Sequence, residues 1–185
     1  MRMRRRYKVI IIAVIVIIFA SLFVLGQEKF RSTFPQAENI IYNIGEKGTL
    51  RDDKVELKIK NYKWMGQKEF EKKYGKFADA IPGSELKMLL VETEFYNKDK
   101  EEHVVEAYNY YIETLGYCNG VGMEGYSMIN KKDMAFTLKA KQKEEIILPY
   151  TIFDFQFRKN KWKKIEKEKF YLTGSWYPVK KRWSL

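Results

Sequence analysis

The pattern of apolar and polar positions divides the chain into two unequal parts. Residues 9–25 form an unbroken apolar run, whereas the apolar positions after it come in short or alternating groups. A helix of that length measures about 26 Å, a little short of the ~30 Å hydrocarbon core of a membrane, and the lysines on either side can reach the headgroups. In lipid, only a helix satisfies the backbone groups of a single segment. The pattern therefore predicts a transmembrane helix over residues 9–26.

The charges on either side of the run orient this helix. Five basic residues and no acidic residue precede it, while the residues just after it are mixed in sign. Because basic flanking segments stay in the cytoplasm, we expect residues 1–8 inside the cell and the chain from about residue 27 outside. A cleaved signal peptide is the main alternative, since it has the same basic and apolar parts. No cysteine stands directly after the run, which argues against a bacterial lipoprotein anchor.

Beyond the anchor, the pattern predicts a stalk and then one domain made mostly of strands. Residues 27–38 contain Pro35 and show no sustained periodicity, so we interpret them as a short stalk before a domain of residues 39–185. Strands are expected where apolar and polar residues alternate or where β-branched and aromatic residues gather. The predicted strands cover residues 39–43, 55–64, 86–97, 104–115, 146–152 and 170–178.

Turns and short helices are predicted between these strands. Residues 67–74 are helix formers with Phe70 and Tyr74 on one face, which predicts a short helix. The basic residues 158–169 predict one or two further helical turns, and Asn119-Gly120 predicts a hairpin turn. The fold class that follows is all-β: an immunoglobulin-like β-sandwich with one or two short helices, preceded by a single N-terminal transmembrane helix.

Composition narrows the compartment and the partners. The formal net charge of +11 falls to +6 once the five basic residues before the run are set aside, which leaves 30 basic residues against 24 acidic ones. A moderately basic outer domain favours anionic lipids or anionic envelope polymers, and nucleic acid is not expected outside a cell. Cys118 is the only cysteine, so no intramolecular disulfide can form and the domain must be held by its core. Exported proteins of Gram-positive bacteria often lack disulfides.

Several spaced pieces of the C-terminal half resemble one family. They are residues 115–120 (LGYCNG), 148–151 (LPYT), 155–157 (FQF), Trp162 and residues 176–180 (WYPVK). The family is a set of uncharacterised membrane-anchored domains of Gram-positive bacteria, known only as a domain of unknown function. It is similar in organisation to the telokin-like, immunoglobulin-like ectodomains of many Firmicutes surface lipoproteins. The resemblance covers roughly residues 36–181. It implies an immunoglobulin-like sandwich outside the membrane and transfers no catalytic or ligand residue.

Enzyme signatures are sparse in this sequence. His103 is the only histidine, so a zinc site would need carboxylates for its other ligands, and Cys118 with His103 is the only cysteine–histidine pair. Patterns of the GxSxG, P-loop and GxGxxG kind are missing. Glu92 and Glu94 lie two apart on a predicted strand, and such a pair serves a glycosidase if both converge on one pocket. We expect no catalytic residue, no metal and no cofactor.

A binding surface is the stronger candidate. Basic residues interleaved with Trp162 and Trp183 resemble a surface that meets anionic polymer or lipid headgroups, and exposed Tyr or Trp can stack on sugars or anchor a partner. Phe153, Phe155 and Phe157 alternate, so we expect them to face the core. The candidate surface consists of Trp162, Lys163, Lys164, Trp176, Tyr177, Lys180 and Lys181.

The sequence thus predicts a single-pass membrane protein with a cytoplasmic N-terminus and an outer domain that acts as a non-catalytic binding module of a Gram-positive cell envelope. Its expected partners are the membrane and either an anionic envelope polymer or a membrane or surface protein. Two alternatives stay open. One is an envelope hydrolase or transferase that uses carboxylates on the sheet, and the other is an accessory subunit of a membrane complex.

Overall fold

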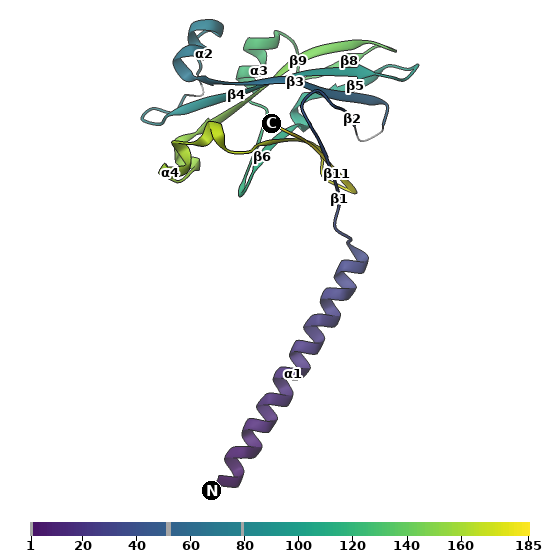
Figure 1. Cartoon of the computed structure of the whole chain (residues 1–185), viewed down its shortest axis with the longest axis vertical. Helices are drawn as coiled ribbons and strands as arrows, with labels where there is room; N and C mark the ends of the chain where they lie inside the picture. The colour runs from purple at the N-terminus through teal and green to yellow at the C-terminus, as the bar shows by residue number, and fades with distance from the viewer. Residues whose placement is uncertain (1, 51–52, 79) are drawn as a thin grey trace. The chain divides into compact units, whose positions relative to one another are not determined.

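The computed structural model describes residues 2–50, 53–78 and 80–185, which form two compact units, Met1–Ala37 and Glu38–Leu185 (Figure 1). The first unit is a single helix with a short extension, and the second is a domain of strands. We describe each unit by itself.

The first unit is built on helix α1 (Arg2–Thr33). Its segment Val9–Thr33 contains an 18-residue window with a mean hydropathy of 3.3. Within the described residues, this is the one helix long and apolar enough to cross a membrane. Residues 27–33 of the predicted stalk continue this helix, although the sequence shows no sustained periodicity there. Gln, Glu, Lys and Arg are good helix formers, and the hydroxyls of Ser32 and Thr33 donate to the Lys29 carbonyl at 2.8 and 2.9 Å.

The second unit consists of two main sheets and a two-stranded ribbon. The first sheet has the order β1 (Glu38–Tyr42), β11 (Val179–Ser184), β10 (Tyr171–Ser175), β6 (Tyr111–Thr114) and β7 (Tyr117–Gly120). The second has the order β2 (Lys47–Thr49), β3 (Val55–Gly66), β4 (Leu86–Asn97) and β9 (Lys143–Phe153). Strands β5 (His103–Glu106) and β8 (Ala135–Leu138) form the ribbon.

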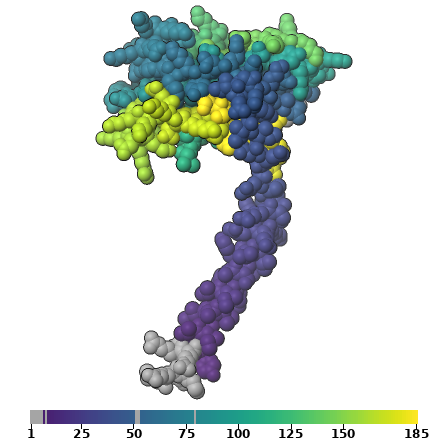
Figure 2. Space-filling view, viewed as in Figure 1, coloured from purple at the N-terminus to yellow at the C-terminus, as the bar shows by residue number. Residues whose placement is uncertain are grey.

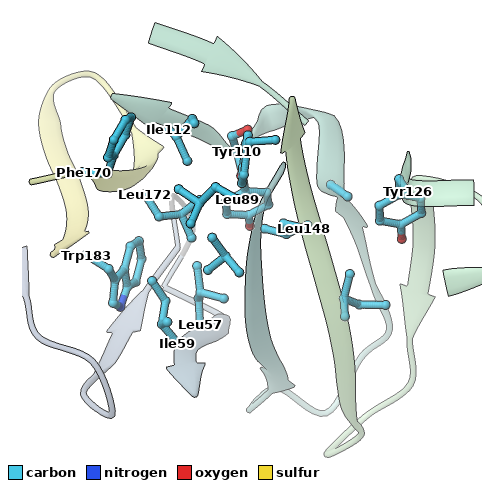
Figure 3. Close-up of a cluster of buried hydrophobic side chains, with 14 of the residues drawn as sticks. Leu57, Ile59, Leu89, Tyr110, Ile112, Tyr126, Leu148, Phe170, Leu172 and Trp183 are labelled. Carbon is cyan, nitrogen blue, oxygen red and sulfur yellow. The ribbon is translucent and has the colours of Figure 1, made fainter. Parts of the chain in front are cut away.

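The core lies between the two main sheets, which confirms the β-sandwich. Leu57 and Ile59 of β3 and Leu148 of β9 meet Leu172 of β10 and Trp183 of β11 in one buried cluster (Figure 3). These residues occupy alternate positions on their strands because successive side chains point to opposite faces. The predicted face of β4, with Leu89, Val91, Thr93 and Phe95, is likewise buried.

Helices cover part of the outer face of the second sheet. Helix α2 (Gln67–Tyr74) has the bounds expected from the sequence and buries Phe70 in a smaller cluster with Met88 and Leu90 of β4. Both faces of β4 are therefore apolar along part of its length. Helix α3 (Met123–Asn130), which the sequence analysis did not predict, contacts β9.

The middle of the chain departs from the predicted strands. Residues 104–115 do not form one strand, because β5 and β6 are separated by a 3₁₀ turn, Ala107–Asn109. The predicted Asn119-Gly120 turn is also wrong, since both residues lie inside β7. The Asn119 side-chain amide donates to the Thr151 carbonyl at 2.8 Å, which ties this strand to β9. The hairpin turns instead at Gly116, which has a φ of +76°.

The C-terminal end differs most from expectation. The chain turns after β10 and returns as β11, which inserts between β10 and β1, so residues 180–183 belong to a central strand. The inward orientation predicted for Phe153, Phe155 and Phe157 is wrong for Phe155, because β9 ends at Phe153 and a 3₁₀ turn (Asp154–Gln156) exposes the next ring. The helical turns expected in the basic connection are present as α4 (Lys159–Trp162) and a 3₁₀ turn (Ile165–Lys167).

Candidate binding surfaces

The residues of the predicted surface lie at two separate ends of the sandwich. Trp162, Lys163 and Lys164 precede β10, while Trp176 and Tyr177 follow it. The five residues of β10 span about 16 Å, so the two groups are divided by the length of that strand. In the domain of Figure 1, α4 and the beginning of β11 lie at opposite ends. We call them the basic end (residues 156–169) and the aromatic end (residues 174–178 and 104–111).

The basic end carries a group of cations, several of which have no ion-pair partner among the described residues. Its seven basic residues are Arg158, Lys159, Lys161, Lys163, Lys164, Lys167 and Lys169. Lys161 lies 4.0 Å from the Glu168 carboxylate. In the part of the chain that the structure describes, no ion pair engages Arg158, Lys159, Lys163 or Lys164. Their side chains are exposed, and the yellow-green segment around α4 projects from the surface in Figure 2.

Trp162 does not form part of the exposed surface. Its side chain is only 8% exposed, and its indole N–H donates to a carboxylate oxygen of Glu85 at 2.8 Å. The ammonium of Lys87 lies 5.4 Å from the centre of one of its rings. Trp162 therefore fixes the basic connection to the beginning of β4, and its role is to position the lysines around it.

A groove of about 730 Å³ lies beside these cations. It is lined by Leu115, Gly116, Tyr117, Gln156, Phe157, Arg158, Lys159, Asn160 and Lys161. The Tyr117 and Phe157 rings pack with their centres 4.7 Å apart, and Leu115 is 88% exposed at the hairpin turn. Burial raises the pKa of Tyr117 to about 12, so its hydroxyl keeps its proton at neutral pH. The groove thus combines aromatic walls with a basic rim.

The aromatic end forms a second groove, of about 920 Å³. Its lining is Leu50, Val55, Val104, Val105, Glu106, Asn109, Tyr110, Tyr111, Gly174, Ser175, Trp176 and Tyr177. Trp176 is 43% exposed and Tyr177 is 56% exposed. The Trp176 ring packs edge-on against Tyr111 at 6.1 Å between centres, and the Lys180 ammonium lies 4.4 Å from the centre of one of its rings. The exposed indole is therefore held in place by its neighbours.

Lys180 and Lys181 are engaged inside the domain. Lys180 forms an ion pair with Glu113 at 2.7 Å, and Lys181 forms one with Asp53 at 2.9 Å. Glu113 also accepts from Arg182 at 3.2 Å and from the Thr173 hydroxyl at 3.0 Å. Burial tends to raise the pKa of Glu113, but the hydrogen bonds from Lys180 and Thr173 outweigh it and lower that pKa. These lysines join strands to one another and are not available cations.

Glu92 and Glu94, the predicted carboxylate pair, do not meet in one pocket. Glu92 lines a cavity of about 350 Å³ together with Glu144 and Glu145, whereas Glu94 does not line it and forms an ion pair with Lys143 at 3.3 Å. Glu145 is engaged by Lys60 at 2.7 Å, and Glu144 by Lys132. The arrangement is a sheet surface on which acidic and basic residues alternate.

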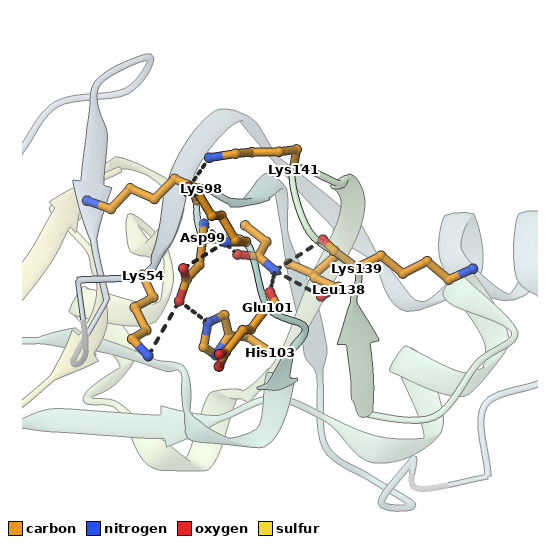
Figure 4. A network of polar contacts seen from close by, with 10 residues as sticks. Lys54, Lys98, Asp99, Glu101, His103, Leu138, Lys139 and Lys141 are labelled. Atoms are coloured by element: carbon orange, nitrogen blue, oxygen red, sulfur yellow. Dashed lines mark hydrogen bonds and ion pairs between the residues drawn. The ribbon is translucent and has the colours of Figure 1, made fainter.

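His103 belongs to a structural network at the β4–β5 turn (Figure 4). Its Nε2 atom lies 2.9 Å from the Asp99 carboxylate, which also pairs with Lys54 at 3.4 Å. The hydrogen bond with His103 is the main reason that the pKa of Asp99 falls to about 2. Cys118 is exposed on β7, in a different sheet from His103. Among the described residues, no three His, Cys, Asp or Glu side chains are grouped so that they could hold a metal ion.

The comparison with protein families decides the classification. Residues 32–181 match the family described as Domain of unknown function (DUF5028). The chain belongs to this family. The match begins near the C-terminal end of α1 and ends inside β11, so both grooves lie on the DUF5028 domain. Among curated proteins, no relative matches the chain.

Solved bacterial structures resemble the DUF5028 domain at low identity. A candidate lipoprotein, YcdA of Bacillus subtilis, is 11% identical, with a TM-score of 0.48 over 75% of this chain and 38% of that one. An uncharacterised beta-sandwich protein of Clostridium difficile is 11% identical, with a TM-score of 0.45 over 81% and 97%. The YjhA protein of Bacillus subtilis is 12% identical, with a TM-score of 0.43 over 75% and 84%. Since these TM-scores lie below 0.5, the assignment of the β-sandwich fold is based on the strand order and the buried core of this chain.

Proposed function

We propose that the chain is a single-span membrane protein whose immunoglobulin-like DUF5028 domain binds an anionic polymer of a Gram-positive cell envelope without catalysis. The observation that carries this proposal is the basic end, where Arg158 and Lys159, exposed and without ion-pair partners in the described residues, line a groove with aromatic walls. Lys163 and Lys164, equally exposed and unpaired in those residues, follow a few positions later in the chain. The apolar helix Val9–Thr33 supports the anchoring, and the basic residues 2–8 ahead of it favour a cytoplasmic N-terminus.

The chemistry of the groove selects the class of polymer. Lys and Arg side chains bind phosphate and carboxylate groups by charge-assisted hydrogen bonds. The faces of Tyr117 and Phe157 offer contact for the carbon skeleton between those charges. A polyol phosphate or an acidic polysaccharide, which alternates charged groups with short apolar or sugar units, fits both features. Exposed charges give modest energies, so the binding would depend on several contacts and weaken with salt.

The two alternatives make different demands on the molecule. An envelope hydrolase would need paired carboxylates in one pocket, and Glu94 lies apart from the cavity that Glu92 lines. An accessory subunit would use α1 as its interface. In that case its activity would be lost when the order of residues 9–25 is scrambled at constant hydrophobicity, and the basic end would be dispensable.

The proposal is tested by binding of the full chain, in a neutral detergent, to immobilised polyglycerol phosphate at low and high salt. The basic-end variant replaces Lys159, Lys163 and Lys164 with Gln. An exposed charged contact contributes about 0.2–1 kcal/mol, so the loss of these three contacts should weaken binding roughly tenfold and reduce its dependence on salt. The matched control replaces Lys68, Lys72 and Lys76 with Gln, which removes the same charge from exposed positions on or beside α2.

The control variant should bind like the parent chain. Equal weakening in both variants would mean that only net charge matters, and this result would contradict a site at the basic end. Binding that is unaffected in both variants would place the polymer contact elsewhere on the chain and contradict the basic end as its site. A parent chain that does not bind the polymer would overturn the proposal and leave the accessory-subunit alternative. The anchoring is tested separately by flotation of the chain with vesicles and by protease digestion from the outside.

A further inference from the structure

We propose that the aromatic end is a membrane-contact surface, in which Trp176 and Tyr177 enter the headgroup layer of the same membrane that holds helix α1. The inference rests on the anchoring in the proposed function but not on the polymer. The partner of the aromatic end is a lipid surface, which it contacts at the interface between headgroups and acyl chains.

A short connection joins the helix to the domain. Helix α1 ends at Thr33 and β1 begins at Glu38, so residues 34–37 join them. Extended chain covers at most ~3.6 Å per residue, so this linker reaches no further than about 18 Å whatever its conformation. The N–H of Glu38 donates to the Pro178 carbonyl at 3.2 Å. The chain therefore enters the domain beside the loop that carries Trp176 and Tyr177.

Helix α1 extends beyond its apolar run and leaves the membrane before the linker begins. The apolar run ends at Leu25, and the helix rises about 12 Å from there to Thr33, which takes it through the headgroup layer. The rings of Phe30 and Phe34, both exposed, lie 5.1 Å apart at this end. With the linker this short, the domain is held next to the outer leaflet, and the loop after β10 is at its tethered end.

The aromatic end has the residue types that are typical of a membrane interface. Trp and Tyr are enriched at membrane interfaces, because their rings are apolar while their N–H or O–H groups form hydrogen bonds with water and headgroups. Val104, which is also exposed, adds apolar area, and among the described residues that line the groove Glu106 alone is charged. The neighbouring Lys180 and Lys181 are engaged by Glu113 and Asp53. This end thus offers little free positive charge for a polyanion and suits insertion of aromatic rings.

The contact would also orient the domain. The aromatic end and the basic end are separated by the length of β10. When Trp176 and Tyr177 rest on the lipid, the free lysines of the basic end face away from the membrane. That is the direction in which an envelope polymer outside the cell would be met.

The test uses the full chain in vesicles of phosphatidylcholine and phosphatidylglycerol whose acyl chains are brominated near the headgroup. Bromine quenches only those tryptophans that approach the lipid. We expect quenching in the parent chain and loss of most of it in Trp176→Phe. The matched control is Trp162→Phe, which removes a buried indole of the other end and should keep the quenching.

Each outcome separates this inference from the proposed function. A chain that does not float with the vesicles overturns the anchoring itself. A chain that floats but shows no quenching, or equal quenching after Trp176→Phe, overturns the lipid contact and leaves polymer binding untouched. Protection of Trp176 from acrylamide that rises with protein density, without bromine quenching, would assign this surface to a second copy of the chain and also overturn the proposal.

Discussion

The two ends of the sandwich carry similar residue types but present them in opposite ways. At the basic end, Trp162 is buried against Glu85, and Lys163 and Lys164 next to it project without ion-pair partners in the described residues. At the aromatic end, Trp176 is exposed and the nearby Lys180 is held by Glu113. The comparison teaches that tryptophans and lysines close together in sequence need not form one surface. Which side chain is available depends on which one the strands and turns have already engaged.

The largest expected effect separates two tryptophans that lie seven residues apart. Trp183 is fully buried and stacks on Tyr42 with ring centres 5.0 Å apart, so Trp183→Ala should lower the free energy of unfolding by about 3–5 kcal/mol. Trp176→Ala should cost less than about 1 kcal/mol, because its ring is half-exposed. Urea denaturation of both variants measures the difference. Equal losses of unfolding free energy in the two variants would show that Trp176 is a core residue. The aromatic end could then not be an exposed binding surface.

A second prediction concerns the close approach of β2 to the buried Trp183. A Cβ atom at Gly48 would lie 2.4 Å from the Trp183 ring and 2.6 Å from that of Tyr42. Gly48→Ala should therefore destabilise the domain by about 1–3 kcal/mol through overpacking. The control Gly66→Ala has open space around the new atom and should be close to neutral. Thermal unfolding compares the two, and a neutral Gly48→Ala would contradict the packing of Trp183.

The third prediction tests whether Lys180, which lies beside the aromatic end, is engaged by Glu113. Glu113→Gln leaves Lys180 and Arg182 without their carboxylate, so it should cost about 1–2 kcal/mol. The folded-state pKa of Glu113 lies below its unfolded value, so its contribution is present above the unfolded pKa and is lost as the pH falls through the folded pKa. The variant should accordingly show a flatter loss of stability in acid. If the parent and the variant lose stability equally as the pH falls, Glu113 does not engage Lys180 in an ion pair that stabilises the fold.

The smallest expected effect on stability belongs to the basic end. Replacing Lys159, Lys163 and Lys164 with Gln should change the free energy of unfolding by no more than about 0.5 kcal/mol, since these side chains are exposed and have no ion-pair partner in the described residues. Because the substitutions remove like charges that lie close together, the variant can even gain a little stability. Calorimetry measures the change in unfolding temperature and enthalpy. A loss of several kcal/mol would mean that the lysines hold the fold, and the weakened binding of the same variant could not then be assigned to a site.

Much of the fold could be predicted from residue patterns. The period of two in β3 and β4, the run of helix formers in α2 and the apolar run in α1 each predict their element, because burial on one face imposes the pattern directly. Strand β11 was missed because half of its sequence, VKKRWS, is basic. In this central strand, those cations are engaged by Glu113 and Asp53, which lie far away in the sequence.

The candidate surface could be predicted only in part. The residue types were visible in the sequence, but their division between two ends depends on the return of β11 beside β1. The burial of Trp162 depends on Glu85, a partner 77 positions away. The groove beside Tyr117 depends on a turn at Gly116, whereas the sequence favoured Asn119-Gly120. Long-range pairings of this kind leave no local period.

The central claim is that the two ends of the domain face different surroundings, lipid at the aromatic end and envelope polymer at the basic end. It is tested most directly by spin labels placed at Tyr177→Cys or Lys159→Cys in a Cys118→Ser background of the full chain in vesicles. The account predicts that the label at 177 collides preferentially with oxygen dissolved in the lipid. The label at 159 should collide with a water-soluble nickel complex and lose mobility when polyglycerol phosphate is added. Equal exposure to water at both positions, or a polymer effect at 177, would contradict it.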